Sequence, residues 1–188
     1  VQVQYALGCD YFLFVSAINR RKNLPNILRA FARYKEQSGS DVRFLVGGGR
    51  AGKQAEVDEV LATMRHGTDV RFLGHLPAKE LALVTGASIA LVYASLFEGF
   101  GIPIIEAYNA ETAVITSNTS SMPEVAGDAA LLVDPLSVEQ IADAMTKLAS
   151  DHLFRSQLIE KGREQRRRFS WDLSAQKLWA CIEKATRP

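Results

Sequence analysis

The chain has 188 residues, 47% of them apolar, and its 22 basic and 21 acidic residues leave a net charge of +1. Nucleic-acid binders usually carry a basic face, so this balance argues against that class. No apolar stretch reaches the roughly 18 residues of a membrane span. Cys9 and Cys181 lie at opposite ends and form no metal or redox motif, which favours a reducing compartment.

Six short apolar runs alternate with amphipathic stretches along the chain. The first, Y-F-L-F-V-S at residues 11–16, is typical of a strand buried on both faces. Asn23 is expected to cap the helix that follows, with Pro25 in its first turn. The predicted strands are 11–16, 42–46, 70–73, 89–92, 113–116 and 130–133, and the predicted helices are 24–38, 54–65, 79–85, 102–110, 137–149, 151–168 and 170–184.

This alternation, with short connections, predicts parallel βαβ units. We therefore expect an α/β fold, namely a Rossmann-like, doubly wound parallel sheet of about six strands with flanking helices and a C-terminal helical segment. No repeat or linker interrupts the pattern, so residues 1–188 are interpreted as a single domain. The chain starts without Met or a signal sequence, which we interpret as a piece of a longer protein.

Residues 93–107, Y-A-S-L-F-E-G-F-G-I-P-I-I-E-A, join a predicted strand to a predicted helix through a glycine turn. In an open α/β sheet, ligands bind at such carboxyl ends of strands, and free N–H groups at a helix start favour an anion. Glu98 and Glu106 flank this turn. Glu106 is expected on a largely covered helix, where a buried carboxylate needs a partner such as a ligand hydroxyl.

Three interpretations of the two glutamates are open. They could be solvated surface charges, or the acid pair of a glycosidase, although the helix rise places them farther apart than the ~5–5.5 Å of a retaining pair. The third fits best: the helix start at Gly101 and Ile102 receives a diphosphate, Glu98 contacts a hexose and Glu106 a ribose. Lys22, in the turn R-R-K-N at residues 20–23, is the candidate cation for the diphosphate, unless this turn is simply solvated.

Two alternatives use other segments. Residues 47–53, G-G-G-R-A-G-K, match both the dinucleotide motif and the start of the P-loop motif, and would give a nucleotide-binding module. However, Gln54 stands where a P-loop needs Ser or Thr, and the segment follows the second strand. A tight turn with positive φ is the other interpretation. The basic segment R-E-Q-R-R-R at residues 163–168 could instead mark a non-catalytic interaction domain.

The segment E-G-F-G-x-P-x-x-E at residues 98–106 resembles the E-x7-E signature of retaining glycosyltransferases of family 4, which include bacterial mannosyl-, glucosyl- and rhamnosyltransferases with the GT-B fold. The resemblance spans essentially the whole chain. Its other segments are F-V-S-A-I-N-R-R-K-N-L (14–24), V-R-F-L-G-H-L (70–76), V-I-T-S-N-T-S-S-M-P-E-V-A-G-D-A-A-L-L-V-D-P (114–135) and F-S-W (169–171).

The resemblance implies roles for individual residues. Glu98 and Lys22 would be catalytic, the first on donor-sugar hydroxyls and the second on the diphosphate. Where the family commonly has a phosphate-binding Arg, this chain has Ala17, and Arg21 or Arg20 is the expected substitute. The remaining substrate-binding residues would be Gly48 at the wall of the nucleotide site, His75 and Leu76 at the base, Glu106 at the ribose, and the backbone of Gly99, Phe100, Gly101 and Ile102 around sugar and phosphate.

The resemblance also implies partners. The chain would be the C-terminal, nucleoside-diphosphate-sugar-binding half of a GT-B enzyme of polysaccharide biosynthesis, with the acceptor domain absent from this chain and the fragment alone inactive. That domain would bring a glycan or lipid-linked acceptor, at the inner face of the membrane in the cytoplasm. No metal, cofactor or nucleic acid is expected. Trp171 and Trp179 on the last helix could pair two copies into a homodimer. The base, the sugar and the acceptor stay open.

Overall fold

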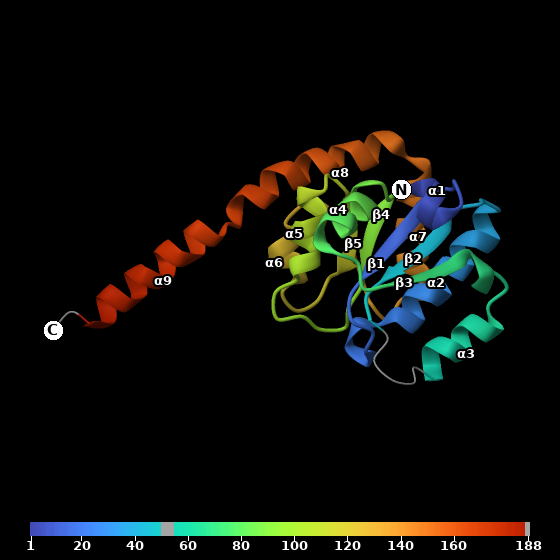
Figure 1. The fold of residues 1–188 in the computed structure, drawn as a ribbon, viewed down its shortest axis with the longest axis horizontal. Helices are drawn as coiled ribbons and strands as arrows, with labels where there is room; N and C mark the ends of the chain where they lie inside the picture. The colour runs from blue at the N-terminus through green and yellow to red at the C-terminus, as the bar shows by residue number, and fades with distance from the viewer. Residues whose placement is uncertain (50–54, 187–188) are drawn as a thin grey trace.

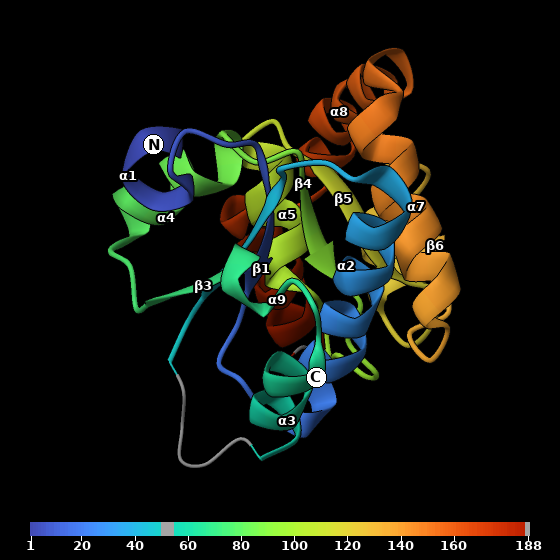
Figure 2. The ribbon, with the colours of Figure 1, turned by 90° about the vertical axis from the view of Figure 1, so that its right-hand side faces the viewer.

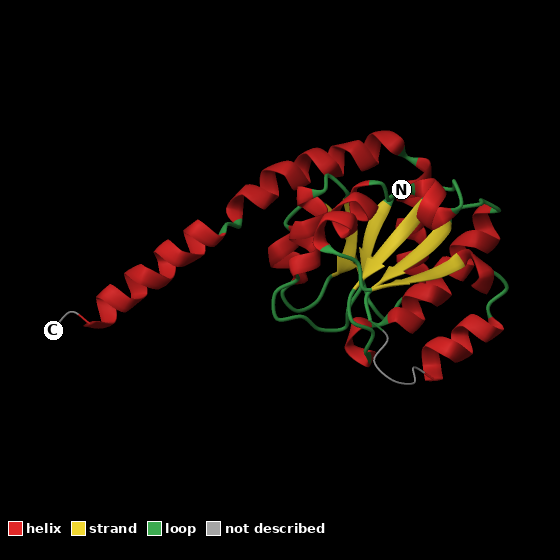
Figure 3. Ribbon diagram, viewed as in Figure 1, coloured by secondary structure: helices red, strands yellow, loops and turns green. Residues whose placement is uncertain are grey.

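The computed structural model describes residues 1–49 and 55–186 and contains one six-stranded parallel sheet between layers of helices (Figures 1 and 3). The strand order is β3-β2-β1-β4-β5-β6, and every neighbouring pair is parallel. This confirms the predicted doubly wound α/β fold. The strands are β1 (Tyr11–Val15), β2 (Arg43–Gly47), β3 (Val70–Gly74), β4 (Ala90–Tyr93), β5 (Ala113–Ser117) and β6 (Ala130–Val133).

The two faces of the sheet are covered by different helices, as Figure 2 shows for α1 and α4 on one side and α2 and α7 on the other. One face carries α2 (Leu24–Ser38), α3 (Ala55–Thr63) and α7 (Val138–Ser150). The opposite face carries α1 (Gln2–Ala6), α4 (Ala78–Gly86), α5 (Ile102–Asn109) and α6 (Met122–Ala126). Short 3-10 turns are η1 (Arg20–Lys22), η2 (Gly67–Asp69) and η3 (Arg166–Arg168).

The strand order changes direction between β1 and β4, which pair through Phe12 with Ala90 and Leu13 with Leu91. From β1 the chain continues to α2 on one face, and from β4 it continues to α5 on the other. The connections after these two strands therefore diverge at the carboxyl edge of the sheet. A crevice forms at such a switch point, and it is where open α/β sheets bind their ligands.

The two helices after α7 leave the sheet progressively. The first, α8 (His152–Gln165), packs on the domain, and its Gly162 leaves room for the ring of Tyr108. The last, α9 (Trp171–Thr186), has no buried residue and extends away from the domain (Figure 1). Its Trp171 and Trp179 are 88% and 62% exposed. Pairing of two copies through them stays a prediction.

The helix caps test the local predictions. The side chains of Ser137 and Asp151 cap α7 and α8 by accepting from Gln140 N–H and Phe154 N–H. Asn23 is the N-cap residue of α2 and Pro25 lies in the first turn, as predicted, but Asn23 has a left-handed conformation and its side chain makes no capping hydrogen bond. Its side chain donates instead to a backbone carbonyl oxygen in the loop after β4. No helix among the described residues is long and apolar enough to cross a membrane.

Candidate functional site

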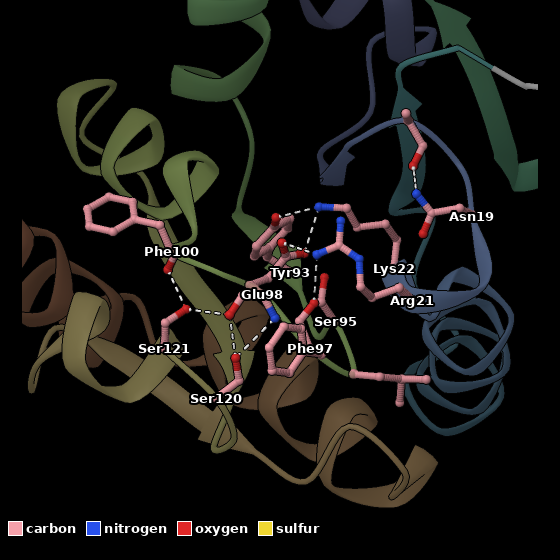
Figure 4. A network of polar contacts seen from close by, with 12 residues as sticks. Asn19, Arg21, Lys22, Tyr93, Ser95, Phe97, Glu98, Phe100, Ser120 and Ser121 are labelled. Atoms are coloured by element: carbon pink, nitrogen blue, oxygen red, sulfur yellow. Dashed lines mark hydrogen bonds and ion pairs between the residues drawn. The ribbon is translucent and has the colours of Figure 1, made fainter.

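Lys22 and Glu98 meet at the carboxyl edge of the sheet, from η1 after β1 and from the loop after β4 (Figure 4). The Lys22 ammonium donates to Glu98 Oε1 at 2.6 Å and to the Tyr93 hydroxyl at 2.8 Å. Both charged residues are buried, with 8% and 7% exposure. The structure therefore joins the two predicted catalytic residues, which are far apart in the sequence, in one ion pair, and Lys22 is no part of a solvated turn.

Arg21 occupies the second oxygen of the same carboxylate. Its Nη1 donates to Glu98 Oε2 at 2.9 Å and to the Phe97 carbonyl oxygen at 3.0 Å. The guanidinium side chain is 45% exposed, whereas that of Lys22 is 10% exposed. Two cations thus face one carboxylate, which leaves this edge of the sheet with an excess of positive charge.

Burial and hydrogen bonding shift the pKa of the Glu98 carboxyl in opposite directions. Burial raises the pKa of the Glu98 carboxyl, but hydrogen bonds with Lys22 and Tyr93 and the charge of the Lys22 ammonium outweigh burial, so its pKa lies below the ordinary value. Burial, with the nearby Glu98 carboxylate, raises the pKa of Tyr93. The Tyr93 hydroxyl is therefore neutral and the Glu98 carboxylate charged. A glycosidase needs a general acid whose pKa is raised, so the glycosidase interpretation loses support.

The backbone around Glu98 is held by two serines from the loop before α6. Ser120 Oγ accepts from Glu98 N–H at 3.0 Å and donates to the Glu98 carbonyl oxygen at 2.5 Å. Ser121 Oγ donates to the Phe100 carbonyl oxygen at 2.8 Å. Tyr93, Ser120 and Ser121 were not among the residues predicted for the site. Two adjacent serines in the polar stretch S-N-T-S-S-M-P at residues 117–123 could have indicated hydrogen-bonding side chains near the site.

Asn23 fixes η1 to the loop after β4. Its side-chain amide donates to the carbonyl oxygens of Ala94 at 2.9 Å and Pro135 at 2.7 Å. Leu96 N–H donates to the Arg21 carbonyl oxygen at 2.9 Å. These contacts explain why the Asn23 side chain makes no capping hydrogen bond to α2. They also hold the backbones of the two loops in register, so that Lys22 meets Glu98.

The start of α5 is open to a ligand. Gly101 precedes this helix with φ 112°, a conformation that favours glycine, and no side chain caps the helix. Gly99, Phe100 and Ile102 are exposed, and the Phe100 ring packs edge-on against Phe169 at 5.6 Å. Backbone N–H groups at an uncapped helix start attract anions.

Glu106 lies on α5 but does not share the environment of Glu98. A cavity of about 230 Å³ lies between α4 and α5, and Glu106 lines it with Val15, Leu81 and Pro103. The expectation that Glu106 lies on a covered face is wrong, because it is exposed. The helix buries Ile104, Ala107 and Tyr108 against the sheet, and at 3.6 residues per turn Glu106 points away from them. Its side chain has no hydrogen-bond or ion-pair partner among the described residues.

Gly48 directly follows β2 at the same edge of the sheet and has a φ of 128°. A Cβ atom there would lie 2.0 Å from the Ser16 carbonyl oxygen, so this backbone conformation requires glycine. His75 is exposed and Leu76 half-buried, in the connection from β3 to α4, and neither lines the cavity beside Glu106. Residues 50–53 of the glycine motif, which include Gly52 and Lys53, lie outside the described residues.

The basic segment at the end of α8 is already paired within the domain. Arg163 contacts Glu111 and Glu160, Arg167 contacts Glu164, and Arg166 donates to backbone carbonyls of α5. These contacts weaken the interpretation as a docking surface. Over residues 1–49 and 55–186, no group of three His, Cys, Asp or Glu side chains could hold a metal ion. Metal independence stays a prediction.

The chain matches the family described as Glycosyl transferases group 1 over residues 6–165. It is similar to O-antigen chain mannosyltransferase B of Escherichia coli, at 32% identity over 86% of this chain and 42% of that protein. Its fold is similar to that of sucrose-phosphate synthase from Thermosynechococcus elongatus (TM-score 0.84, 24% identity, 98% of this chain and 48% of that chain). It is also similar to an Anabaena protein solved with UDP and glucose (TM-score 0.84, 18% identity, 97% of this chain and 51% of that chain). The chain thus spans about half the length of these proteins or less.

Proposed function

The chain belongs to the glycosyl transferases group 1 family, and on this premise we propose that it binds a nucleoside-diphosphate sugar at the carboxyl edge of β1 and β4. It would be the C-terminal donor half of a two-domain, retaining glycosyltransferase of family 4. The observation that carries the proposal is the pairing of Lys22 and Arg21 with Glu98 beside the uncapped start of α5.

The charges in this network suit a diphosphate. The Lys22 ammonium has three donors, and Tyr93 and Glu98 account for two of them. The third donor, the guanidinium of Arg21 and the free amides at the start of α5 supply positive potential for a dianionic group. The cavity beside Glu106 lies next along α5 and offers a carboxylate to ribose hydroxyls.

We propose the following roles during transfer. The bond between the sugar C1 and the β-phosphate oxygen breaks, and negative charge grows on the leaving diphosphate, where Lys22 stabilises it. Glu98 accepts hydrogen bonds from sugar hydroxyls and so orients the ring. A new bond forms from the acceptor oxygen to C1 on the same face, and the acceptor proton passes to the leaving phosphate. No step requires a metal ion.

The acceptor belongs to the proposed N-terminal domain, which would bring a glycan or lipid-linked chain at the cytoplasmic face of the membrane. The similarity to an O-antigen mannosyltransferase supports a role in polysaccharide synthesis. We expect residues 1–188 alone to transfer no sugar, because in this proposal the acceptor is bound by the N-terminal domain. Turnover of any sugar nucleotide by the chain alone would contradict this part of the proposal.

Calorimetric titration with GDP, UDP, ADP and dTDP tests the binding proposal. We expect one or more of the four to bind, and absence of binding to all four at millimolar concentration would refute it. Lys22→Met should weaken binding by about 1.5–3 kcal/mol, the usual contribution of hydrogen bonds to charged groups. Lys35→Met is the matched control, because Lys35 is also a buried lysine in an ion pair, with Asp69, but lies on α2 away from this edge. It should leave binding unchanged.

A further inference from the structure

The two cations on Glu98 differ in how firmly they are held. Lys22 is enclosed, with two hydrogen bonds and its ammonium 5.0 Å from the centre of the Tyr93 ring, whereas the Arg21 side chain is nearly half exposed. We propose that Arg21 is an exchangeable cation: it pairs with Glu98 as the structure shows and moves to the diphosphate when the donor binds. This inference rests on the proposed function and assigns the second phosphate cation of that site.

Competition for charge supplies the physical reason. Glu98 and a diphosphate are both negative, and in the structure both cations pair with the single carboxylate of Glu98. A diphosphate arriving beside this carboxylate would be repelled unless one cation turned toward it. The planar guanidinium pairs two of its N–H groups with a phosphate at once, so the exchange replaces one contact to Glu98 by a stronger, two-pronged one.

The local geometry lets Arg21 turn without moving the loop. The hydrogen bond from Leu96 N–H to its carbonyl oxygen anchors the backbone, and its neighbour Lys22 is buried. Only Nη1 makes the contacts with Glu98 and the Phe97 carbonyl oxygen. An ion pair with a half-exposed partner contributes little stability, so its release costs little.

The exchange also releases Glu98 for its proposed role. In the structure each carboxylate oxygen accepts from a cation, Oε1 from Lys22 and Oε2 from Arg21. Departure of Arg21 leaves Oε2 able to accept from a sugar hydroxyl, at the moment when the phosphate arrives. Donor binding and exposure of the sugar-binding oxygen would then be one coupled event.

Arg20 provides the comparison within the same turn. It is also exposed, but its side chain makes no hydrogen bond or ion pair with any residue that the structure describes. The geometry therefore favours Arg21 over Arg20 as the second phosphate cation. The variants Arg21→Ala and Arg20→Ala each remove one exposed positive charge from the same turn. The difference between them therefore isolates the position next to Glu98.

The test is calorimetric titration of the chain and its variants with the nucleoside diphosphate that the unaltered chain binds among GDP, UDP, ADP and dTDP. Arg21→Ala should weaken binding on the order of tenfold, the effect of losing a hydrogen bond to a charged group. Arg20→Ala should change it by less than about twofold, because only a screened surface charge is lost. Glu98→Gln, which removes the competitor for Arg21, should strengthen binding, and Arg21→Ala should cost more in that background than in the unaltered chain.

Other results would overturn the exchange. If Arg21 stays on Glu98, Arg21→Ala will leave diphosphate affinity unchanged or increase it. Equal losses for Arg20→Ala and Arg21→Ala would reduce the effect to general surface charge. Both results presuppose diphosphate binding by the unaltered chain, so they differ from failure of the proposed function, in which none of the four nucleotides binds. The exposed Arg21 variant does not depend on whether Glu98→Gln folds.

Discussion

Glu98 and Glu106 belong to one short segment, yet their surroundings are opposite. Glu98 is 7% exposed and has Lys22 and Arg21 on its two oxygens. Glu106 is exposed, and its side chain has no partner among the described residues. This difference indicates that Glu98 holds the two cations in place without a ligand. Glu106, in contrast, would gain hydrogen-bond partners only from a ligand. The following experiments test this division of roles.

The largest expected effect is on stability. Glu98→Ala leaves the buried Lys22 without its counter-ion, and breaking one side of a buried pair costs about 3–5 kcal/mol. Glu106→Ala removes an exposed side chain and should change the free energy of unfolding by less than about 0.5 kcal/mol. Urea denaturation of both variants measures the contrast. Similar losses of unfolding free energy in the two variants would contradict the structural role assigned to Glu98.

For Glu106 we expect the reverse pattern, in which substitution weakens ligand binding but leaves stability unchanged. We expect Glu106→Ala to weaken nucleoside-diphosphate binding by about 1–3 kcal/mol, through lost contacts to ribose hydroxyls, without loss of stability. Glu106→Gln is the matched control for charge, because it keeps a hydrogen-bond acceptor at the same place. Calorimetry with the diphosphate gives both values. Full affinity in Glu106→Ala would remove Glu106 from the site.

The dependence of stability on pH is the smallest effect and sharpens the role of Glu98. Its folded-state pKa is lower than in the unfolded chain, so its stabilising contribution is present above the ordinary pKa of 4.5 and is lost as the pH falls below that value. The unaltered chain should therefore lose stability below pH 4.5 more steeply than Glu98→Gln does. Urea denaturation at several pH values gives the unfolding free energy as a function of pH for both proteins. If the two curves are parallel, the charged Glu98 carboxylate does not stabilise the fold.

The fold could be predicted well because its signal is local. Strands buried on both faces appear as continuous apolar runs, and all six were found within one or two residues of their observed bounds. Two short helices, α1 and α6, were missed. The start of α6 lies within the polar stretch S-N-T-S-S-M-P, where turn-forming residues hide a helix of five residues.

The site could be predicted only in part, because its contacts are long-range. The candidates Lys22 and Glu98 were found from residue type and place, but their direct pairing joins positions 76 apart, which no local pattern encodes. Asn23 illustrates the same limit, since its side-chain N–H groups donate to carbonyl oxygens after β4 and β6, and this orientation leaves its oxygen without a capping bond to α2. The exposure of Glu106 was different: the helical spacing of Ile104, Ala107 and Tyr108 already indicated it.

A structure of this chain with a bound nucleoside diphosphate tests the central claim most directly. We predict that the phosphates lie between η1 and the start of α5, with a phosphate oxygen within hydrogen-bond distance of Lys22 Nζ and the ribose hydroxyls at Glu106. Phosphates bound instead on the glycine segment at residues 47–53, with the Lys22 and Glu98 pair untouched, would contradict the account.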